Sequence, residues 1–349
     1  MAYTTINKST AHFNTKLYSG NGYNGNAQNG IGFRPDWTWI KHRNGTAAHV
    51  LTDAVRGTNK HITADTNAAQ VTSTAYIASF DSDGFTLNND GDVNGSGRTY
   101  ASWNWKAGGG QGSSNTDGSI NTTYTSVNTT AGFSISQYDG TGSGATVGHG
   151  LGATPKIILW KRLDSNDGAV NWIVQSPLLD NRNKLVLNTT EAKSYNSSFA
   201  NVDNWSNSVF TLGTYEGQND SNGTYVAYAF AEKTGYSKFG TYTGNGSSSN
   251  GTFVYTGFKP KLVIVKEYGS TGNWIMKNDY YDNQNDHYLL ANSSDAETSG
   301  SVVAFDLLSN GFKLRGTAGD SNGNGASILY MAFAENPIVG SNNVPATAR

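Results

Sequence analysis

Short stretches in which apolar and polar residues alternate run through the chain, separated by turns rich in Gly, Asn, Asp and Ser. TYASWNWKA, which begins at Thr99, is one of them. Alternation with a period of two is typical of half-buried β-strands. Val, Ile, Tyr, Trp and Phe fill these stretches, and all five favour strands. Since no stretch shows a helical period, the pattern predicts an all-β protein.

One stretch occurs three times. Residues 257–279, GFKPKLVIVKEYGSTGNWIMKND, have counterparts at residues 32–53 and 150–176, each with a proline, an apolar run, a Lys and a polar turn. A Tyr-x-Gly-x-Gly turn precedes each copy, a Phe-x-Leu follows its proline by 50, 55 or 52 residues, and an aromatic strand comes next. Four landmarks in one order indicate three homologous units rather than chance. The prolines are Pro35, Pro155 and Pro260.

The repeat predicts three β-sandwich units of roughly 85 to 100 residues, a normal domain size. Each unit shows about six to eight short strands with turns every 8 to 12 residues, as in a β-sandwich or jelly roll. The expected segments are an N-terminal arm (1–17), unit 1 (18–106), a Gly/Ser/Thr/Asn-rich linker (107–131), unit 2 (132–232), unit 3 (236–336) and a tail (337–349).

The connections between the units differ in length. Only EKTG joins units 2 and 3, which predicts that these two pack together, whereas the longer linker predicts that unit 1 is tethered. The second half of the linker alternates Ile120, Tyr124 and Val127 with Thr and Asn. That half therefore also fits a strand added to the next sheet.

Composition narrows the class of function. Charged residues are 14% of the chain, against about 25% in an ordinary globular protein, so neutral polar groups must cover the surface. A net charge of -2 without a basic tract argues against nucleic-acid binding. The chain has no cysteine, which excludes disulfides and thiolate metal sites. Because neither a signal peptide nor a membrane-spanning stretch is present, we expect a soluble protein made in a cytosol.

One loop resembles the start of a calcium site. Asp90, Asp92 and Asn94 occupy the first, third and fifth positions of a D-x-D-x-N-G sequence, where calcium loops carry oxygen ligands. The closing Glu is missing, because position twelve is Ala101. The loops at Asp220 and Asp320 keep only an Asp-x-Asn-Gly end, which a tight hairpin favours. We therefore expect a hairpin turn and no cofactor, with calcium as the alternative.

No set of residues predicts catalysis. His42 and His49 flank the Asn44-Gly45 turn but lack counterparts in the other units, so surface or turn histidines are expected. The acidic residues lie mostly in turns beside Gly and Asn, and no nucleophile motif occurs. We expect no enzymatic activity, although a β-sandwich glycosidase can hide its two acids from sequence inspection.

Aromatic residues are the better candidates for binding. The chain has 8 Trp, 19 Tyr and 14 Phe, more than three small cores plainly need. For each one, core packing or turn capping is the competing explanation. Tyrosines in Gly- and Asn-rich loops offer rings and hydroxyls to sugars or to a protein partner. These candidates are Tyr23, Tyr138, Tyr195, Tyr215, Tyr242, Tyr268, Tyr280 and Tyr281.

The repeated signature resembles a module of tail-fibre and other virion structural proteins of marine bacteriophages, including those of cyanobacteria. The resemblance rests on GFRPDWTWIKHRNG with DAVRG, on SDGFTL with TYASWNWKAG, and on GFKPKLVIVKE with YMAFAENP, and spans residues 18–336. It implies a concanavalin- or laminin-G-like jelly roll, a virion location and no enzymatic activity. Unit 2 departs from it with GLGATP, and unit 3 lacks the Trp-x-Trp of unit 1.

Three functions follow as hypotheses. The first is a tail fibre or appendage that contacts a glycan or protein receptor on the host surface and binds other virion proteins. The second is a capsid decoration or knob protein, and the third is a polysaccharide depolymerase. A homo-oligomer is expected, with a trimer as one option, while three units in one chain could also approximate a threefold object alone. Neither nucleic-acid binding nor membrane insertion is expected.

Overall fold

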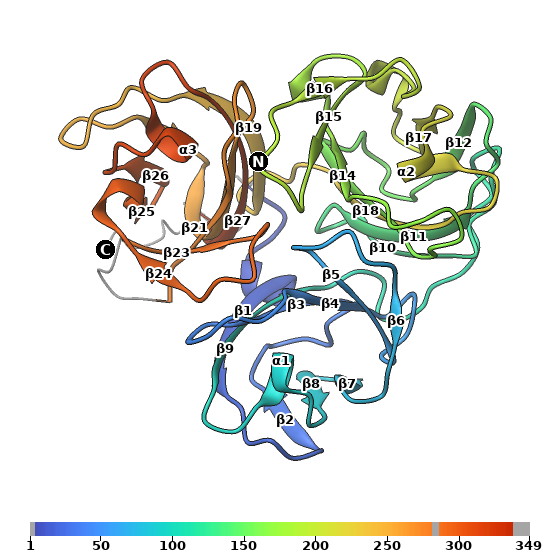
Figure 1. The fold of residues 1–349 in the computed structure, drawn as a ribbon, viewed down its shortest axis with the longest axis horizontal. Coiled ribbons are helices and arrows are strands. Elements are labelled where there is room, and N and C mark those ends of the chain that lie inside the picture. Colours follow the sequence, from blue (N-terminus) through green and yellow to red (C-terminus); the bar gives the residue numbers. More distant parts are fainter. Residues whose placement is uncertain (1–3, 281–285, 338–349) are drawn as a thin grey trace.

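The computed structural model describes residues 4–280 and 286–337. Its architecture is all-β: three large antiparallel sheets and three small ones form three lobes around a common centre (Figure 1). The predicted all-β fold of antiparallel sandwiches is thereby confirmed, while the concanavalin- or laminin-G-like topology stays a prediction. In the described part of the chain, no helix is long and apolar enough to span a membrane.

The large sheets share one strand order. In unit 1 it is β1 (Phe13–Ser19), β9 (Thr99–Trp105), β3 (Trp37–His42), β4 (Val50–Asp53), β5 (Lys60–Thr63) and β6 (Val71–Thr72). In unit 2 it is β10 (Tyr124–Asn128), β11 (Phe133–Asp139), β18 (Thr224–Phe230), β13 (Ile157–Arg162), β14 (Ile173–Gln175), β15 (Asn183–Val186) and β16 (Ser194–Tyr195). In unit 3 it is β19 (Ser237–Thr243), β27 (Ser327–Pro337), β21 (Phe258–Glu267), β22 (Trp274–Asn278), β23 (His287–Leu290) and β24 (Thr298–Ser299).

A small sheet covers the outer face of each large one. The strands are β2 (Asn26–Asn29), β8 (Gly84–Leu87) and β7 (Ile77–Asp81) in unit 1, β12 (Ala145–Gly148) and β17 (Val209–Leu212) in unit 2, and β20 (Phe253–Tyr255), β26 (Gly311–Leu314) and β25 (Phe305–Leu308) in unit 3. Short helical turns complete the units: α1 (Gly91–Asn94), α2 (Glu216–Asn219), α3 (Gly319–Asn322), η1 (Ser9–Ala11), η2 (Pro177–Leu179), η3 (Val202–Asn204) and η4 (Ser301–Val303).

The central strands of each large sheet are buried on both faces, as β3 illustrates. All six of its residues are buried. Because successive side chains of a strand point to opposite faces, Trp37 and Trp39 join a core shared by the three units, whereas Ile40 joins the core between the sheets of unit 1. β13 and β21 alternate in the same way. The repeated segment therefore builds two cores at once.

The shared core joins the units at the centre of the molecule. The ring of Trp37 stacks on that of Tyr228 from unit 2, with centroids 4.4 Å apart and an interplanar angle of 18°. Phe13 and Trp105 of unit 1 both contact the ring of Phe333 from unit 3. Each such aromatic pair contributes about 0.5–1.5 kcal/mol beyond its area burial. The expectation that unit 1 sits on a tether is thus wrong, because its apolar face belongs to the common core.

Two expected segment boundaries differ from the structure. The predicted arm ends at residue 17, yet β1 begins at Phe13 and pairs with β9 along its whole length. The predicted linker contains β10, which pairs with β11 and so confirms the alternative that its second half adds a strand to the next sheet. Ile120 is buried in the core of unit 2. Both strands lie at sheet edges and carry polar residues, Asn14 and Thr15 in β1 and Thr125 and Ser126 in β10, which is why these segments look polar.

Candidate interaction surface

Three buried lysines link each unit to a neighbour in a cyclic order. Lys41, Lys161 and Lys266 are the penultimate residues of the central strands β3, β13 and β21, on the face toward the shared core. Their Nζ atoms donate to carbonyl oxygens of the next unit: Lys41 to Ser294 (3.1 Å), Lys161 to Asn67 (3.0 Å) and Lys266 to Thr190 (3.1 Å). Burial lowers the pKa of each lysine to about 8. The Lys that recurs in the sequence repeat is therefore a joint between units.

A second cyclic set uses His49, Trp172 and Trp274, which stand at matching places beside β4, β14 and β22. The ring nitrogen Nε2 of His49 lies 3.0 Å from the carbonyl oxygen of Leu290. The Nε1 of Trp172 donates to the oxygen of Thr63 (2.8 Å), and that of Trp274 to the oxygen of Val186 (2.9 Å). In each unit, the side chain at this equivalent position thus contacts a backbone carbonyl of the adjacent unit.

The DAVRG sequence of unit 1 forms a buried ion pair. Asp53 and Arg56 have fully buried side chains, and Nε of Arg56 lies 2.5 Å from Oδ2 of Asp53. The hydroxyl of Tyr228, from unit 2, donates to the same Oδ2 at 2.7 Å. A buried ion pair needs such additional hydrogen bonds to offset its desolvation. This motif also joins two units rather than forming a site.

The Tyr-x-Gly-x-Gly turn is held against the short helix of its unit. In unit 2, the hydroxyl of Tyr138 donates to the carbonyl of Gln218 (2.8 Å). Buried Asn219 accepts from the amide of Thr141 (2.7 Å) and donates to the carbonyl of Ser143 (2.6 Å). A Cβ on Gly140 would lie 2.2 Å from the Asp220 carbonyl oxygen, so only glycine fits there. Units 1 and 3 repeat this arrangement with Tyr18 and Asn94, and with Tyr242 and Asn322.

The loop that resembles a calcium site is part of this arrangement. Asp90 caps helix α1, since its Oδ1 accepts from the amide of Asp92 at 2.8 Å. Asn94 is fully buried and bonded to Asn21, Tyr23, Asn26 and Asn88. The expected hairpin is wrong, because residues 91–94 are helical. Within the described chain, no group of three or more His, Cys, Asp or Glu residues is placed to hold a metal ion.

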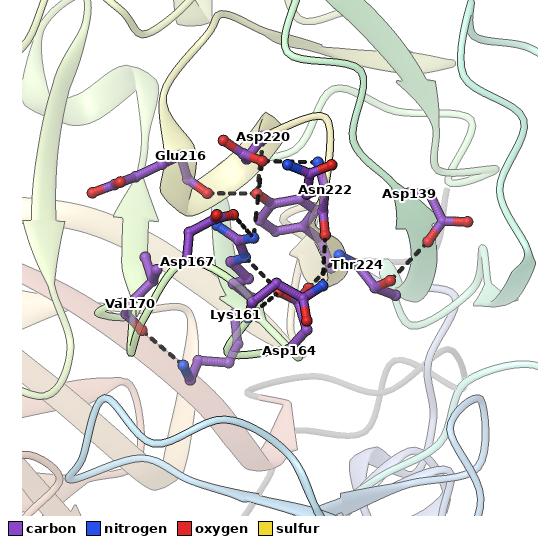
Figure 2. Close-up of polar contacts among 12 residues, drawn as sticks. Asp139, Lys161, Asp164, Asp167, Val170, Glu216, Asp220, Asn222 and Thr224 are labelled. Atoms are coloured by element: carbon purple, nitrogen blue, oxygen red, sulfur yellow. Dashed lines mark hydrogen bonds and ion pairs between the residues drawn. The ribbon is translucent and has the colours of Figure 1, made fainter.

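A dense polar cluster surrounds Arg162, whose side chain is fully buried. Figure 2 shows Asp164, Asp167 and Asp220, which belong to this cluster. Its Nε donates to Asp164 (2.9 Å) and its Nη2 to Asp167 (2.6 Å), while Asp220 lies 3.9 Å away. Asp164 also accepts from the amide of Thr224 at 2.6 Å. These contacts fasten the turn after β13 to the start of β18. Because all three carboxylates lie around the same guanidinium group, the cluster has a structural role.

His42 and His49 are buried rather than on the surface, so the expected surface or turn positions are wrong. Trp39 Nε1 donates to Nδ1 of His49 at 2.8 Å, which places the proton on Nε2 and lets that atom donate to Leu290. Burial lowers the pKa of His49 to about 3, so the ring is neutral. His42 bonds Asn44 at 2.8 Å.

The candidate tyrosines fall into three groups. Tyr23 and Tyr195 are 75% and 64% exposed, so their rings are accessible to a partner. Tyr138 is fully buried, which removes it from the candidates. The Gly-rich sequence beside it suggests a loop, but the residue belongs to the core. The remaining described candidates are partly buried and pack against a core: Tyr215, Tyr242, Tyr268 and Tyr280. Tyr281 lies outside the described residues.

Two exposed aromatic residues were not among the sequence candidates. Phe253 and Tyr255 are 43% and 55% exposed and stand on the same face of β20, with buried Val254 between them. The alternation in TFVYT predicts a half-buried strand. The structure shows that Val254 is the buried residue, so both aromatic side chains point outward. We define Tyr23, Tyr195, Phe253 and Tyr255 as the exposed aromatic set.

No curated protein and no solved structure matches this chain. One family matches residues 8–337, from just before η1 to the end of β27, and so includes all three large sheets and their shared core. This chain belongs to that family, which is described as a domain of unknown function, DUF7483.

Proposed function

We propose that this chain is a bacteriophage virion structural protein, a tail-fibre or appendage component that contacts the host surface. The observation that carries the proposal is that the residues repeated in all three units hold the fold together, while the exposed aromatic residues differ from unit to unit. The repeated lysines, prolines, tyrosines and glycines serve the scaffold, and three of the lysines join units. Features that differ between units, above all the exposed aromatic set, are left for recognition.

The composition supports such a role. Only 14% of the residues of the chain are charged, so neutral polar groups must cover much of the surface, and no cysteine depends on a redox partner. Exposed aromatic rings among Gly, Asn and Ser offer contact area at low entropic cost, as in binding paratopes. The partners proposed on this basis are a glycan or protein receptor and other virion proteins. The similarity of the repeated motifs to phage tail-fibre modules supports the same assignment.

Capsid decoration is a second candidate, favoured by one specific observation. The three lobes surround a common centre (Figure 1), and their contacts follow one cyclic order. An approximately threefold chain suits a threefold position of a shell. In this case the recognition surface would face the capsid rather than the host.

Antibody-gold labelling of intact particles separates these functions. Label at tail tips is the result expected for a fibre component, and label over the shell would select decoration. Particles without label at either place would overturn both. Incubation with host polysaccharide tests the absence of enzymatic activity, since released oligosaccharides would show a depolymerase.

Receptor binding is tested with the exposed aromatic set. Loss of binding to host-surface glycan or protein is expected for Tyr23→Ala combined with Tyr195→Ala. The matched control is Tyr215→Ala, because that ring packs on Phe199 with centroids 4.4 Å apart. Binding that survives in the double variant would place the receptor contact elsewhere on the surface.

A further inference from the structure

Strand β20 of unit 3 lies at the free edge of its small sheet. The sheet order is β20-β26-β25, and among the described strands β20 pairs only with β26. The oxygen of Thr252 accepts from Leu314, and the amide of Thr256 donates to Asn310. Because antiparallel ladders alternate, the peptide groups of Phe253 and Tyr255 point away from β26. An extended chain beside β20 would meet these two peptide groups.

The equivalent edge of unit 2 is covered by the chain itself. Val147 of β12 faces Phe210 as Val254 of β20 faces Phe312, so Thr146 corresponds to Phe253. The oxygen of Thr146 accepts from the amide of Ile120, and its amide donates to the hydroxyl of Ser119, both at 2.9 Å. The outer edge of this small sheet can therefore form hydrogen bonds with a further segment of chain.

The equivalent edge of unit 1 is protected in another way. β2 carries the polar sequence Asn-Ala-Gln-Asn, and Nζ of Lys16 donates to the oxygen of Asn29 at 2.5 Å. Lysines and polar side chains are the usual means of blocking edge-to-edge pairing. β20 instead presents Phe-Val-Tyr, and the sequence from 239 to 258 contains no charged residue.

We propose that β20 pairs with β20 of a second copy of this chain, so that two small sheets join into one. Antiparallel pairing about Val254 places Phe253 opposite Tyr255 of the second copy, and Tyr255 opposite Phe253. The outward peptide groups of these residues then form hydrogen bonds across the twofold axis. Two cross-strand aromatic pairs result, each adding to the stability of the pairing.

A second copy fits this edge because of its charge pattern. A twofold axis brings each residue near its own copy, so a charged strand would meet like charges. β20 and its flanks have none. On the neighbouring strand β26, Lys313 lies opposite Phe253. Lys313 and its copy would lie three strand spacings apart, about 14 Å, which exceeds the Debye length of about 8 Å in physiological salt.

Sedimentation velocity of the full chain from about 1 µM to 1 mM tests the proposal. The wild-type chain is expected to show a concentration-dependent monomer–dimer equilibrium. Tyr255→Lys places like charges across the axis, and Phe253→Pro removes an outward N–H that bonds nothing within the sheet. Each variant is expected to weaken dimerisation at least about tenfold. Melting temperatures show that the variants fold.

Tyr195→Lys is the matched control, because Tyr195 is exposed on the edge strand β16 of unit 2. This variant should dimerise like the wild type. A wild-type chain that remains monomeric over the whole range would overturn the proposal. A dimer that is unaffected by Tyr255→Lys and by Phe253→Pro, or that is lost in Tyr195→Lys, would equally overturn it.

Discussion

The Nε2 atom of His49 lies 3.0 Å from the carbonyl oxygen of Leu290, and this contact joins the first unit of the chain to the last. The residues are 241 positions apart in sequence. Trp172 and Trp274 make the corresponding contacts to Thr63 and Val186. Each unit thus donates to one neighbour and accepts from the other. Three repeats in one chain thereby form a closed arrangement.

The contribution of this arrangement is measurable in unit 2. Trp172→Phe removes the indole donor to Thr63, whereas Trp160→Phe removes an indole nitrogen with no partner among the described residues. Both tryptophans are fully buried, so the lost volume is the same. Trp172→Phe should lower the free energy of unfolding by about 1–3 kcal/mol more than Trp160→Phe, the cost of an unpaired carbonyl. Urea denaturation measures this difference, and equal losses would contradict the role of the inter-unit bond.

Acid should destabilise the fold through His49. Burial holds its pKa at about 3, below the unfolded value of about 6.5. As the pH falls below about 6.5, the unfolded chain binds a proton that the folded chain does not, and stability decreases. From pH 7 to 5 this residue alone accounts for a loss of about 2 kcal/mol. His49→Gln keeps a donor and an acceptor and should show a correspondingly smaller loss. Identical pH profiles of unfolding in the two proteins would refute this assignment.

Asn219 and Asn222 should respond differently to the same change. Asn219 is fully buried and donates to the carbonyls of Ser143 and Gly213. Asn219→Asp replaces that donor with an acceptor, so we expect a loss of about 1–3 kcal/mol in unfolding free energy. Asn222 is exposed, and Asn222→Asp should change stability by less than about 0.5 kcal/mol. Comparable losses in thermal or urea unfolding would show that Asn219 is not the residue that holds the turn.

The Asp90 loop should behave as a helix cap. Asp90→Ala should cost about 1 kcal/mol, whereas Asp90→Asn, which keeps a capping oxygen, should cost little. Millimolar calcium should leave the melting temperature of all three proteins unchanged. A calcium-dependent rise in the wild type that disappears in Asp90→Asn would instead establish a calcium site.

The sequence predicts the strands well because the alternation of apolar and polar residues recurs in all three units. It was wrong for β1, an edge strand with few apolar residues, whereas β10 agrees with the alternative that the linker adds a strand to the next sheet. The matched Lys41, Lys161 and Lys266 were visible in the repeat, but their partners lie in other units and no local pattern identifies them. Similarly, Tyr138 and Tyr23 share a Gly-rich context, and only tertiary packing separates the buried ring from the exposed one.

Differential scanning calorimetry of the full chain tests most directly whether the three units form one body. A shared core with cyclic contacts predicts a single transition whose calorimetric and van't Hoff enthalpies agree. Trp172→Phe should move that transition as a whole to lower temperature. Two or more separable transitions, with the variant shifting only one of them, would contradict the account.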